Sequence, residues 1–120
     1  MPRRFFPALL LVAAGTLAAC GSKASPFGDA KAGYAAFLTT CTTCHGADAK
    51  GIPGLGKDLT TSEFLRGQTD EQTLAFLLTG RRADDPLNTT GVDMPPKGNN
   101  PALSEDDLKN IIAYLRTIQP

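Results

Sequence analysis

The segment Cys41-Thr42-Thr43-Cys44-His45 is the feature that most restricts how this chain can fold. It contains two of the three cysteines and the only histidine of a 120-residue chain. A chain of this length forms one domain with a small hydrophobic core, so a buried metal, disulfide or large apolar cofactor would add stability that the core alone lacks. The chemistry of these five residues therefore bears on the fold as well as on the function.

Three kinds of site use cysteines at this spacing. A disulfide between Cys41 and Cys44 would form a redox motif, but that motif normally follows a buried strand, whereas the residues before Cys41 have a helical pattern. A structural zinc site needs four Cys or His ligands, and too few remain if Cys20 is used elsewhere. C-x-x-C-H is the attachment motif of c-type haem, in which the thiols bond the vinyl groups and the imidazole of His45 ligates the iron. We favour the haem interpretation because it uses all three side chains.

The N-terminal residues have the pattern of an export signal. Arg3 and Arg4 precede an apolar run that ends in small residues. The run is shorter than the roughly 20 residues of a membrane-spanning helix. We therefore expect residues 1–19 to be a signal peptide that is removed, the alternative being a retained helical anchor. Export agrees with haem attachment, which bacteria carry out after export.

The segment Leu17-Ala18-Ala19-Cys20 resembles the lipobox of bacterial lipoproteins, in which the cysteine is lipid-modified and becomes the mature N-terminus. The alternative is an ordinary cleavage site followed by a free thiol, which is unfavourable in an oxidising compartment. The resemblance implies a protein held by acyl chains on Cys20 at the cell membrane or outer membrane of a bacterium, facing the periplasm. Residues 20–28 would then be the lipidated cysteine and a short linker.

The charge balance gives no indication of nucleic-acid binding. The chain has 12 basic and 12 acidic side chains. Removal of residues 1–19 would take away Arg3 and Arg4 and leave a net charge of about −2. The large basic field that follows phosphates is absent from this composition, so a partner must be recognised through local patches.

Residues 29–120 are predicted to form one all-α domain. From Asp29 onward the helical spacing gives one apolar or small face, consisting of Ala30, Gly33, Tyr34, Phe37, Leu38 and Cys41. A glycine inside a helix costs roughly 0.5–1 kcal/mol relative to alanine. Gly33 therefore suggests that another backbone packs against this helix.

The rest of the domain alternates loops and helices. The glycines of residues 46–56 predict a loop, residues 61–66 a short helical turn, and residues 81–102 a loop throughout. Thr69 with Gln72 is a capping box for a helix that ends at Gly80. The final helix has Ser104 and Asp107 as its capping box, and its apolar stripe is Leu108, Ile111, Ile112, Leu115 and Ile118.

The motif Cys41–His45 within this helical pattern resembles the class I cytochrome c family, over nearly all of residues 29–120. In that family an N-terminal helix with a glycine and an aromatic residue crosses a C-terminal helix with an aliphatic and an aromatic residue. Gly33 and Phe37 match the first helix, and Ile111 and Tyr114 match the second. The resemblance implies a cytochrome c fold, with three to four helices around one covalently bound haem and a long loop that bears a methionine.

Met94 is the candidate for the sixth iron ligand. His45 is the only histidine, and Met1 would be lost with the signal peptide. The family places its axial methionine in a loop before the C-terminal helix, and the sequence Asp93-Met94-Pro95-Pro96 resembles that site. Alternatively, Met94 fills a gap under the loop. Lys97 is a poorer candidate because its ammonium group would first have to lose a proton.

With His45 and Met94 as ligands, the iron would have no position free for a small-molecule substrate, and its chemistry would be transfer of single electrons. The resemblance thus implies an electron carrier rather than an enzyme: a membrane-anchored monohaem c-type cytochrome that meets a redox protein donor and acceptor at the membrane. Two alternatives stay open. One is a haem enzyme or sensor with an open sixth site, and the other is a fixed subunit of a respiratory complex.

Departures from the family pattern leave two details unassigned. The family often has Gly-Pro-Asn-Leu after the haem motif, where this chain has Gly56-Lys57-Asp58-Leu59, so the carbonyl that orients the His45 ring is not predicted. The chain has no tryptophan to contact the haem propionates. The candidates for that contact are Tyr34, Arg66, Arg81 and Arg82.

Overall fold

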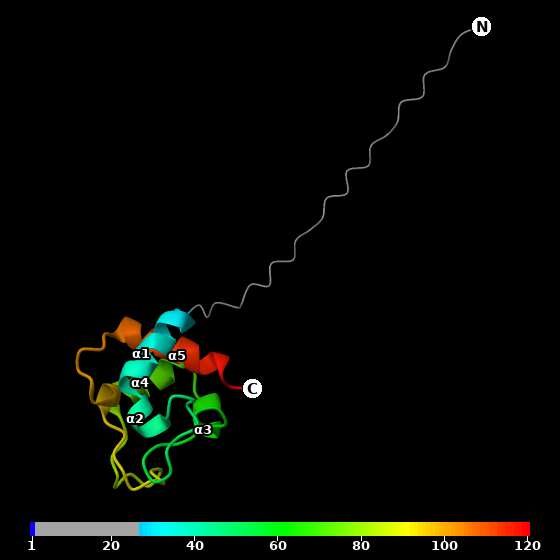
Figure 1. Cartoon of the computed structure of the whole chain (residues 1–120). Coiled ribbons are helices and arrows are strands. Elements are labelled where there is room, and N and C mark those ends of the chain that lie inside the picture. The colour runs from blue at the N-terminus through cyan, green and yellow to red at the C-terminus, as the bar shows by residue number, and fades with distance from the viewer. Residues whose placement is uncertain (2–26) are drawn as a thin grey trace.

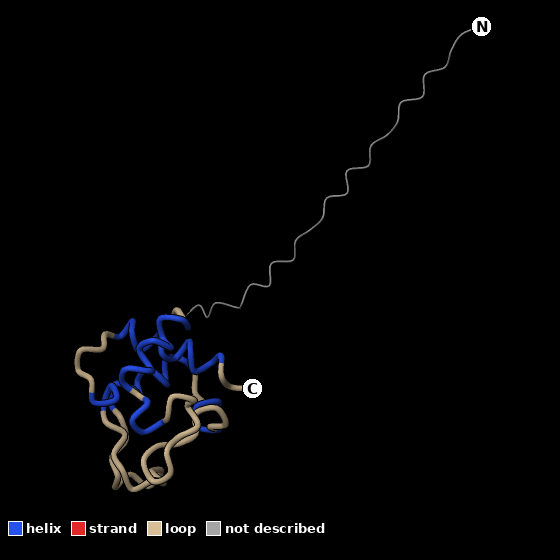
Figure 2. The backbone as a smooth tube through the Cα atoms, in the orientation of Figure 1, coloured by secondary structure: helices blue, strands red, loops and turns tan. Residues whose placement is uncertain are grey.

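A computed structural model describes Met1 and residues 27–120, and the described part of the chain is helical (Figures 1 and 2). The expectations for residues 1–19 and for Cys20 lie outside the described residues. The elements are α1 (Ala30–Thr40), α2 (Thr42–His45), α3 (Glu63–Arg66), α4 (Asp70–Thr79), a 3₁₀ helix η1 (Pro96–Asn99) and α5 (Glu105–Thr117). Within these residues the all-α prediction is confirmed.

Helices α1 and α5 pack against each other, as the resemblance implies (Figure 1). The side chain of Asp29 caps α1 by accepting hydrogen bonds from the N–H groups of Lys31 and Ala32. Gly33 is buried, and a Cβ added to it would collide with the backbone carbonyl of Asn110 in α5. The prediction that another backbone packs at Gly33 is confirmed.

The core lies between α5, α1 and α4. Its largest fully buried side chains are Phe37, Leu108, Ile111, Ile112 and Thr73. The predicted apolar face of α1 is wider than the buried one, because Tyr34 and Leu38 are 44% and 38% exposed. The partly exposed Tyr34 still contacts α5, because its ring centroid lies 5.1 Å from that of Tyr114.

Local sequence signals place the ends of α4 and α5 correctly. Both predicted capping boxes are present, with Thr69 and Gln72 at α4 and Ser104 and Asp107 at α5. The hydrogen bond from Ser104 lowers the pKa of Asp107 below its ordinary value. Glycine 80 ends α4 as expected.

The expectation of loop throughout residues 81–102 is wrong in two places. Helix η1 occupies residues 96–99, and Arg81 and Met94 form an isolated antiparallel bridge. The bridge pairs residues far apart in the chain, so no local periodicity announces it. Lys97 and Gly98 inside η1 have φ values of 54° and 62°, which a search for regular helical patterns does not detect.

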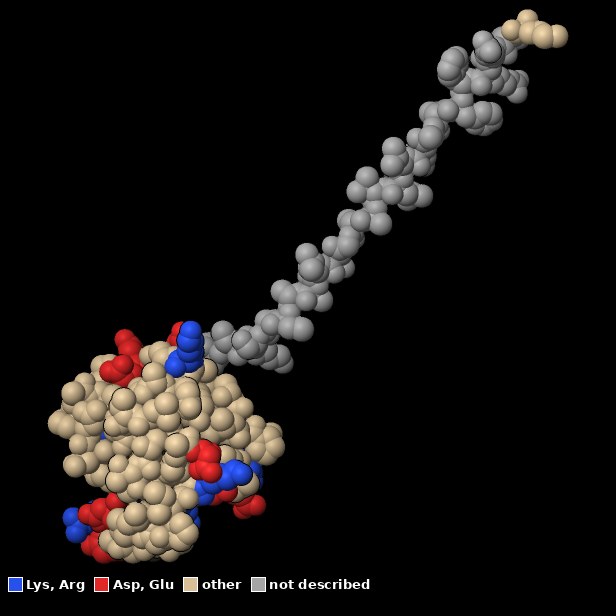
Figure 3. Space-filling model, in the orientation of Figure 1, with Lys and Arg blue, Asp and Glu red and all other residues tan. Residues whose placement is uncertain are grey.

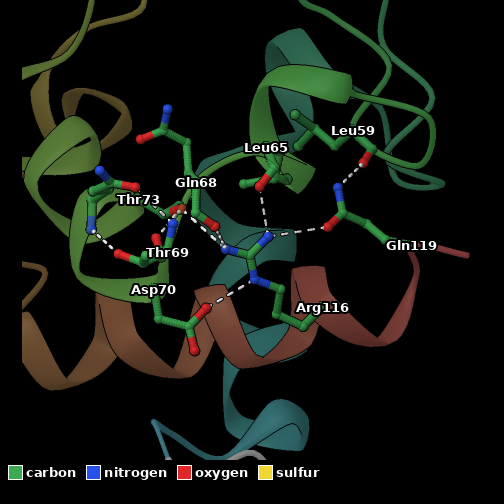
Figure 4. Close-up of polar contacts among 9 residues, drawn as sticks. Leu59, Leu65, Gln68, Thr69, Asp70, Thr73, Arg116 and Gln119 are labelled. Carbon is green, nitrogen blue, oxygen red and sulfur yellow. Dashed lines mark hydrogen bonds and ion pairs between the residues drawn. The ribbon is translucent and has the colours of Figure 1, made fainter.

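Arg116 of α5 joins three parts of the chain (Figure 4). Its guanidinium donates to Asp70 Oδ1 at 2.8 Å, Leu65 O at 2.6 Å, Gln68 O at 2.8 Å, Thr73 Oγ1 at 3.3 Å and Gln119 Oε1 at 3.2 Å. The side chains of Arg116 and Asp70 are only 24% and 27% exposed. The five donors of the planar fork thus connect α5 to α3 and α4.

Replacing Arg116 by alanine is expected to lower the free energy of unfolding by roughly 2–3 kcal/mol, because it leaves a carboxylate and two carbonyls without their partner. Urea denaturation of the haem-loaded protein measures this change. Arg82→Ala is the matched control, since the ion pair of Arg82 with Asp84 is 81% and 73% exposed. The control should cost less than about 0.5 kcal/mol. Equal losses in the two variants would contradict the structural role of Arg116.

On the face seen in Figure 3 the charged side chains lie in small separate groups, some of acidic side chains alone and some of both signs. Among the described residues, no helix combines the length and apolar character needed to span a bilayer.

Candidate functional site

The candidate haem-binding residues that the sequence predicts within residues 29–120 line one cavity of about 490 Å³. Cys41, Cys44, His45 and Met94 all line it. Its other walls are mostly apolar and include Phe37, Leu59, Leu65, Phe76, Leu77, Ile111 and Leu115. A second hollow of about 440 Å³ shares Cys41, Cys44, His45 and Met94 with the first.

The end of α1 and the single turn of α2 carry the two thiols and the imidazole. Cys41 is the C-cap of α1, and its carbonyl accepts a hydrogen bond from the N–H of His45 at 3.0 Å. This turn was not predicted as a separate helix, because α1 was expected to lead straight into the motif. Residues three apart in a helix lie on the same side. The turn therefore brings both thiols to one side of the cavity.

The ring of His45 is oriented by a hydrogen bond to a backbone carbonyl. His45 is 9% exposed, and its Nδ1 lies 2.8 Å from the carbonyl oxygen of Lys57. With the proton on Nδ1, this nitrogen donates to Lys57 and leaves Nε2 as the free lone pair for a metal. The sequence departs from the family pattern at this segment, so the acceptor was not predicted.

Two features keep the Lys57 carbonyl in place. A Cβ at Gly56 would collide with the carbonyl of Cys44, so the segment passes directly against the motif. Asp58 accepts hydrogen bonds from Thr60 Oγ1 at 2.6 Å and from the Thr60 N–H at 2.7 Å. These bonds lower the pKa of Asp58 below its ordinary value.

Cys41 and Cys44 are free thiols in the structure. Burial raises the pKa of Cys41 to about 11, and the neighbouring Cys44 adds to this effect. Among the described residues, no three His, Cys, Asp or Glu side chains form a group that could hold a metal ion.

Met94 lines the same cavity but belongs to a segment far from the motif in the sequence, where it forms a bridge with Arg81. Its N–H donates to the Arg81 carbonyl, and its carbonyl accepts from the Arg81 N–H, both at 2.8 Å. Lys97, the alternative ligand, is not among the residues that line the cavity. Its Nζ donates instead to the carbonyl of Leu103 at 2.8 Å.

Of the four candidates for propionate contact, Arg81 lines the cavity and the others do not. Its guanidinium carbon lies 4.6 Å from the ring centroid of Phe64 and 5.0 Å from that of Phe76. Arg66 and Tyr34 are exposed, and Arg82 is paired with Asp84.

The residues present fit a covalently bound haem. The cavity is apolar and of the size that cofactor sites have, about 300–1,000 Å³. Two free thiols line it beside an imidazole whose orientation is set by a carbonyl, and a thioether lines the same space. This is the donor set of a c-type haem centre.

The chain is similar to known c-type cytochromes. The family model for cytochrome c matches residues 30–119. Cytochrome c-554(547) of Halothiobacillus neapolitanus is 31% identical over 97 residues, which are 77% of this chain and 99% of that protein. The cbb3-type cytochrome c oxidase subunit CcoP of Rubrivivax gelatinosus is 29% identical over 68% of this chain. The match spans only 23% of the length of that subunit.

A solved structure has the same fold. It is cytochrome CL of the marine methylotroph Methylophaga aminisulfidivorans MPT, which is 29% identical with a TM-score of 0.55. The alignment covers 72% of this chain and 51% of the other. Members of this family bind haem c covalently, and Cys41, Cys44 and His45 fit the haem-binding motif. From sequence, fold and donor set together, the chain belongs to the cytochrome c family.

Proposed function

We propose that this protein transfers single electrons as a monohaem c-type cytochrome, with thioether bonds to Cys41 and Cys44 and with His45 and Met94 as axial ligands. The observation that carries the proposal is that one apolar cavity is lined by both thiols, the imidazole and the thioether. Haem iron, when bound, supplies the one-electron redox chemistry.

Each side chain has a separate part in this function. The thiols of Cys41 and Cys44 fix the cofactor in one orientation. The Lys57 carbonyl accepts a hydrogen bond from His45 Nδ1–H and leaves Nε2 free to hold a bound iron. The soft thioether of Met94 would favour reduced iron and raise the reduction potential, and it would leave no position on the iron for a substrate. The apolar walls would exclude water, so little solvent would have to reorganise when the charge at the iron changes.

The proposal includes a lipid anchor at Cys20 after removal of residues 1–19, with residues 29–120 as the haem domain facing the periplasm. Its support is the lipobox resemblance and the short linker sequence. The donor and acceptor would then be redox proteins at the same membrane.

A second candidate function is that of a fixed subunit in a respiratory complex. The similarity to a cbb3-type oxidase subunit favours this candidate. Purification from detergent-solubilised membranes separates the two: a fixed subunit copurifies with other haem proteins in a constant ratio, whereas a mobile carrier elutes alone.

The visible absorption spectrum tests the proposed function. The full chain, expressed with a c-type maturation system, should show covalently bound haem, a sharp low-spin reduced spectrum and the weak far-red band of a methionine-to-Fe(III) bond. Haem without that band would contradict methionine ligation and favour an enzyme or sensor with an open sixth site. Absence of covalent haem would overturn the proposal as a whole.

A further inference from the structure

Gly80 lies where the Met94 segment meets the end of α4. Its φ and ψ are 70° and −167°, a backbone conformation that is almost restricted to glycine. A Cβ at this position would collide with the Met94 carbonyl oxygen and lie 2.9 Å from the Pro95 carbonyl carbon and the Pro96 nitrogen. The absence of a side chain at residue 80 therefore lets the Met94–Pro96 backbone lie directly against α4.

The next residue, Arg81, is held from both sides. Its backbone exchanges two hydrogen bonds of 2.8 Å with Met94. Its guanidinium packs against the rings of Phe64 and Phe76, which belong to α3 and α4. The backbone of Met94 is thus tied to a residue whose side chain is anchored in the helical framework.

The loop between Arg81 and Met94 has its own internal bonds. The side-chain amide of Asn88 donates to the carbonyls of Arg82 at 3.0 Å and Val92 at 2.8 Å. Its oxygen accepts from the N–H groups of Thr90 at 3.0 Å and Gly91 at 2.9 Å. These bonds join residues within the loop and do not attach the loop to α4. The placement of Met94 relative to α4 therefore depends on the contacts at the base of the loop, at Gly80 and Arg81.

We propose that Gly80 is a positioning residue for the sixth ligand: the close approach it permits, together with the Arg81–Met94 bridge, presents the Met94 side chain to the cavity before any bond to iron forms. This inference rests on the proposed function, because it requires Met94 to be the ligand. The inference adds that the protein backbone positions Met94, so that the iron–sulfur bond is not the only interaction that holds this side chain in place.

The first test compares Gly80→Ala with Gly91→Ala in the haem-loaded protein. Gly91 also has a positive φ, 71°, and lies in the same loop, but a Cβ there would meet nothing within 4 Å. Gly80→Ala should keep its covalent haem, weaken the far-red band by at least about five-fold and bind carbon monoxide when reduced. Gly91→Ala should retain the band. An unchanged band in Gly80→Ala, or an equal loss in both variants, overturns the proposal.

A second measurement tests whether the base of the loop is ordered without the iron–sulfur bond, and it does not require Gly80→Ala to fold. Amide hydrogen exchange is measured at residues 81 and 94 in the haem-loaded Met94→Ala variant, in which the alanine at residue 94 cannot ligate the iron. If the base of the loop is preformed, both amides stay protected, exchanging at least about ten-fold more slowly than unstructured amides. Free exchange at both would mean that the iron bond orders the loop, which contradicts the proposal.

Different results refute methionine ligation and the role of Gly80. A far-red band that is absent from the wild type, or that persists in Met94→Ala, refutes methionine ligation and with it the proposed function. Loss of the band in Met94→Ala combined with a normal band in Gly80→Ala leaves the function intact and refutes the role of Gly80.

Discussion

Met94→Ala is expected to keep the haem attached but to lose the low-spin, methionine-ligated state. The thiols of Cys41 and Cys44 and the His45 ring are held by α2 and by Lys57, so attachment does not depend on Met94. In the proposed function the thioether of Met94 is the ligand that favours reduced iron, and the substitution removes it. The reduction potential should fall by roughly 100 mV or more, within the range of about 0.8 V that axial ligands span.

Optical spectroscopy and a redox titration measure both effects. Leu87→Ala is the control, because Leu87 belongs to the same loop and lines the same cavity but is 65% exposed. It should keep the far-red band and a potential close to that of the wild type. An unchanged oxidised spectrum in Met94→Ala would show that another group ligates the iron.

Gly33→Ala is expected to lower the free energy of unfolding by up to about 3 kcal/mol. A Cβ at residue 33 would collide with the backbone carbonyl of Asn110, and a backbone cannot rotate away as a side chain can. Overpacking costs about 1–3 kcal/mol, and the upper end applies here because α1 and α5 would have to separate. The gain in helix propensity, about 0.5–1 kcal/mol, is too small to offset this cost.

Urea denaturation of the haem-loaded protein measures the loss, which should shift the midpoint by about 1 M or more. Gly67→Ala is the matched control. Gly67 has ordinary helical angles, φ −77° and ψ −7°, and an added Cβ would lie 3.3 Å from the nearest atom, the Glu63 carbonyl oxygen. Its effect should stay within about 0.5 kcal/mol. A Gly33→Ala variant as stable as this control would contradict the packing described for α1 and α5.

Local chemistry explains which parts of the fold are predictable from sequence. The capping boxes at Thr69 and Ser104 act within one helical turn, so the sequence around them is sufficient. Gly33 was also informative, because a helical glycine implies a close neighbour. The Arg81–Met94 bridge was not predictable, since its two partners are brought together by the end of α4 and not by any pattern in the loop.

The candidate site also has predictable and unpredictable residues. The spacing of Cys41, Cys44 and His45 is that of a haem-attachment motif, and each of these residues lines the cavity. Lys57 was missed because it acts through its carbonyl, which every residue possesses. The glycine at residue 56, which lets this segment pass against Cys44, was the available signal. The role of Arg81 in the cavity could not be separated from that of other arginines without the positions of Phe64 and Phe76.

The crossing of α1 and α5 also means that the cavity is assembled from distant parts of the chain. Ile111 and Leu115 of α5 form one wall of the cavity, yet they follow His45 by more than sixty residues. A segment that carries Cys41, Cys44 and His45 but lacks α5 would contain both thiols and the imidazole without this wall. Enclosure of the site therefore depends on the long-range contact between α1 and α5 and not on the motif alone.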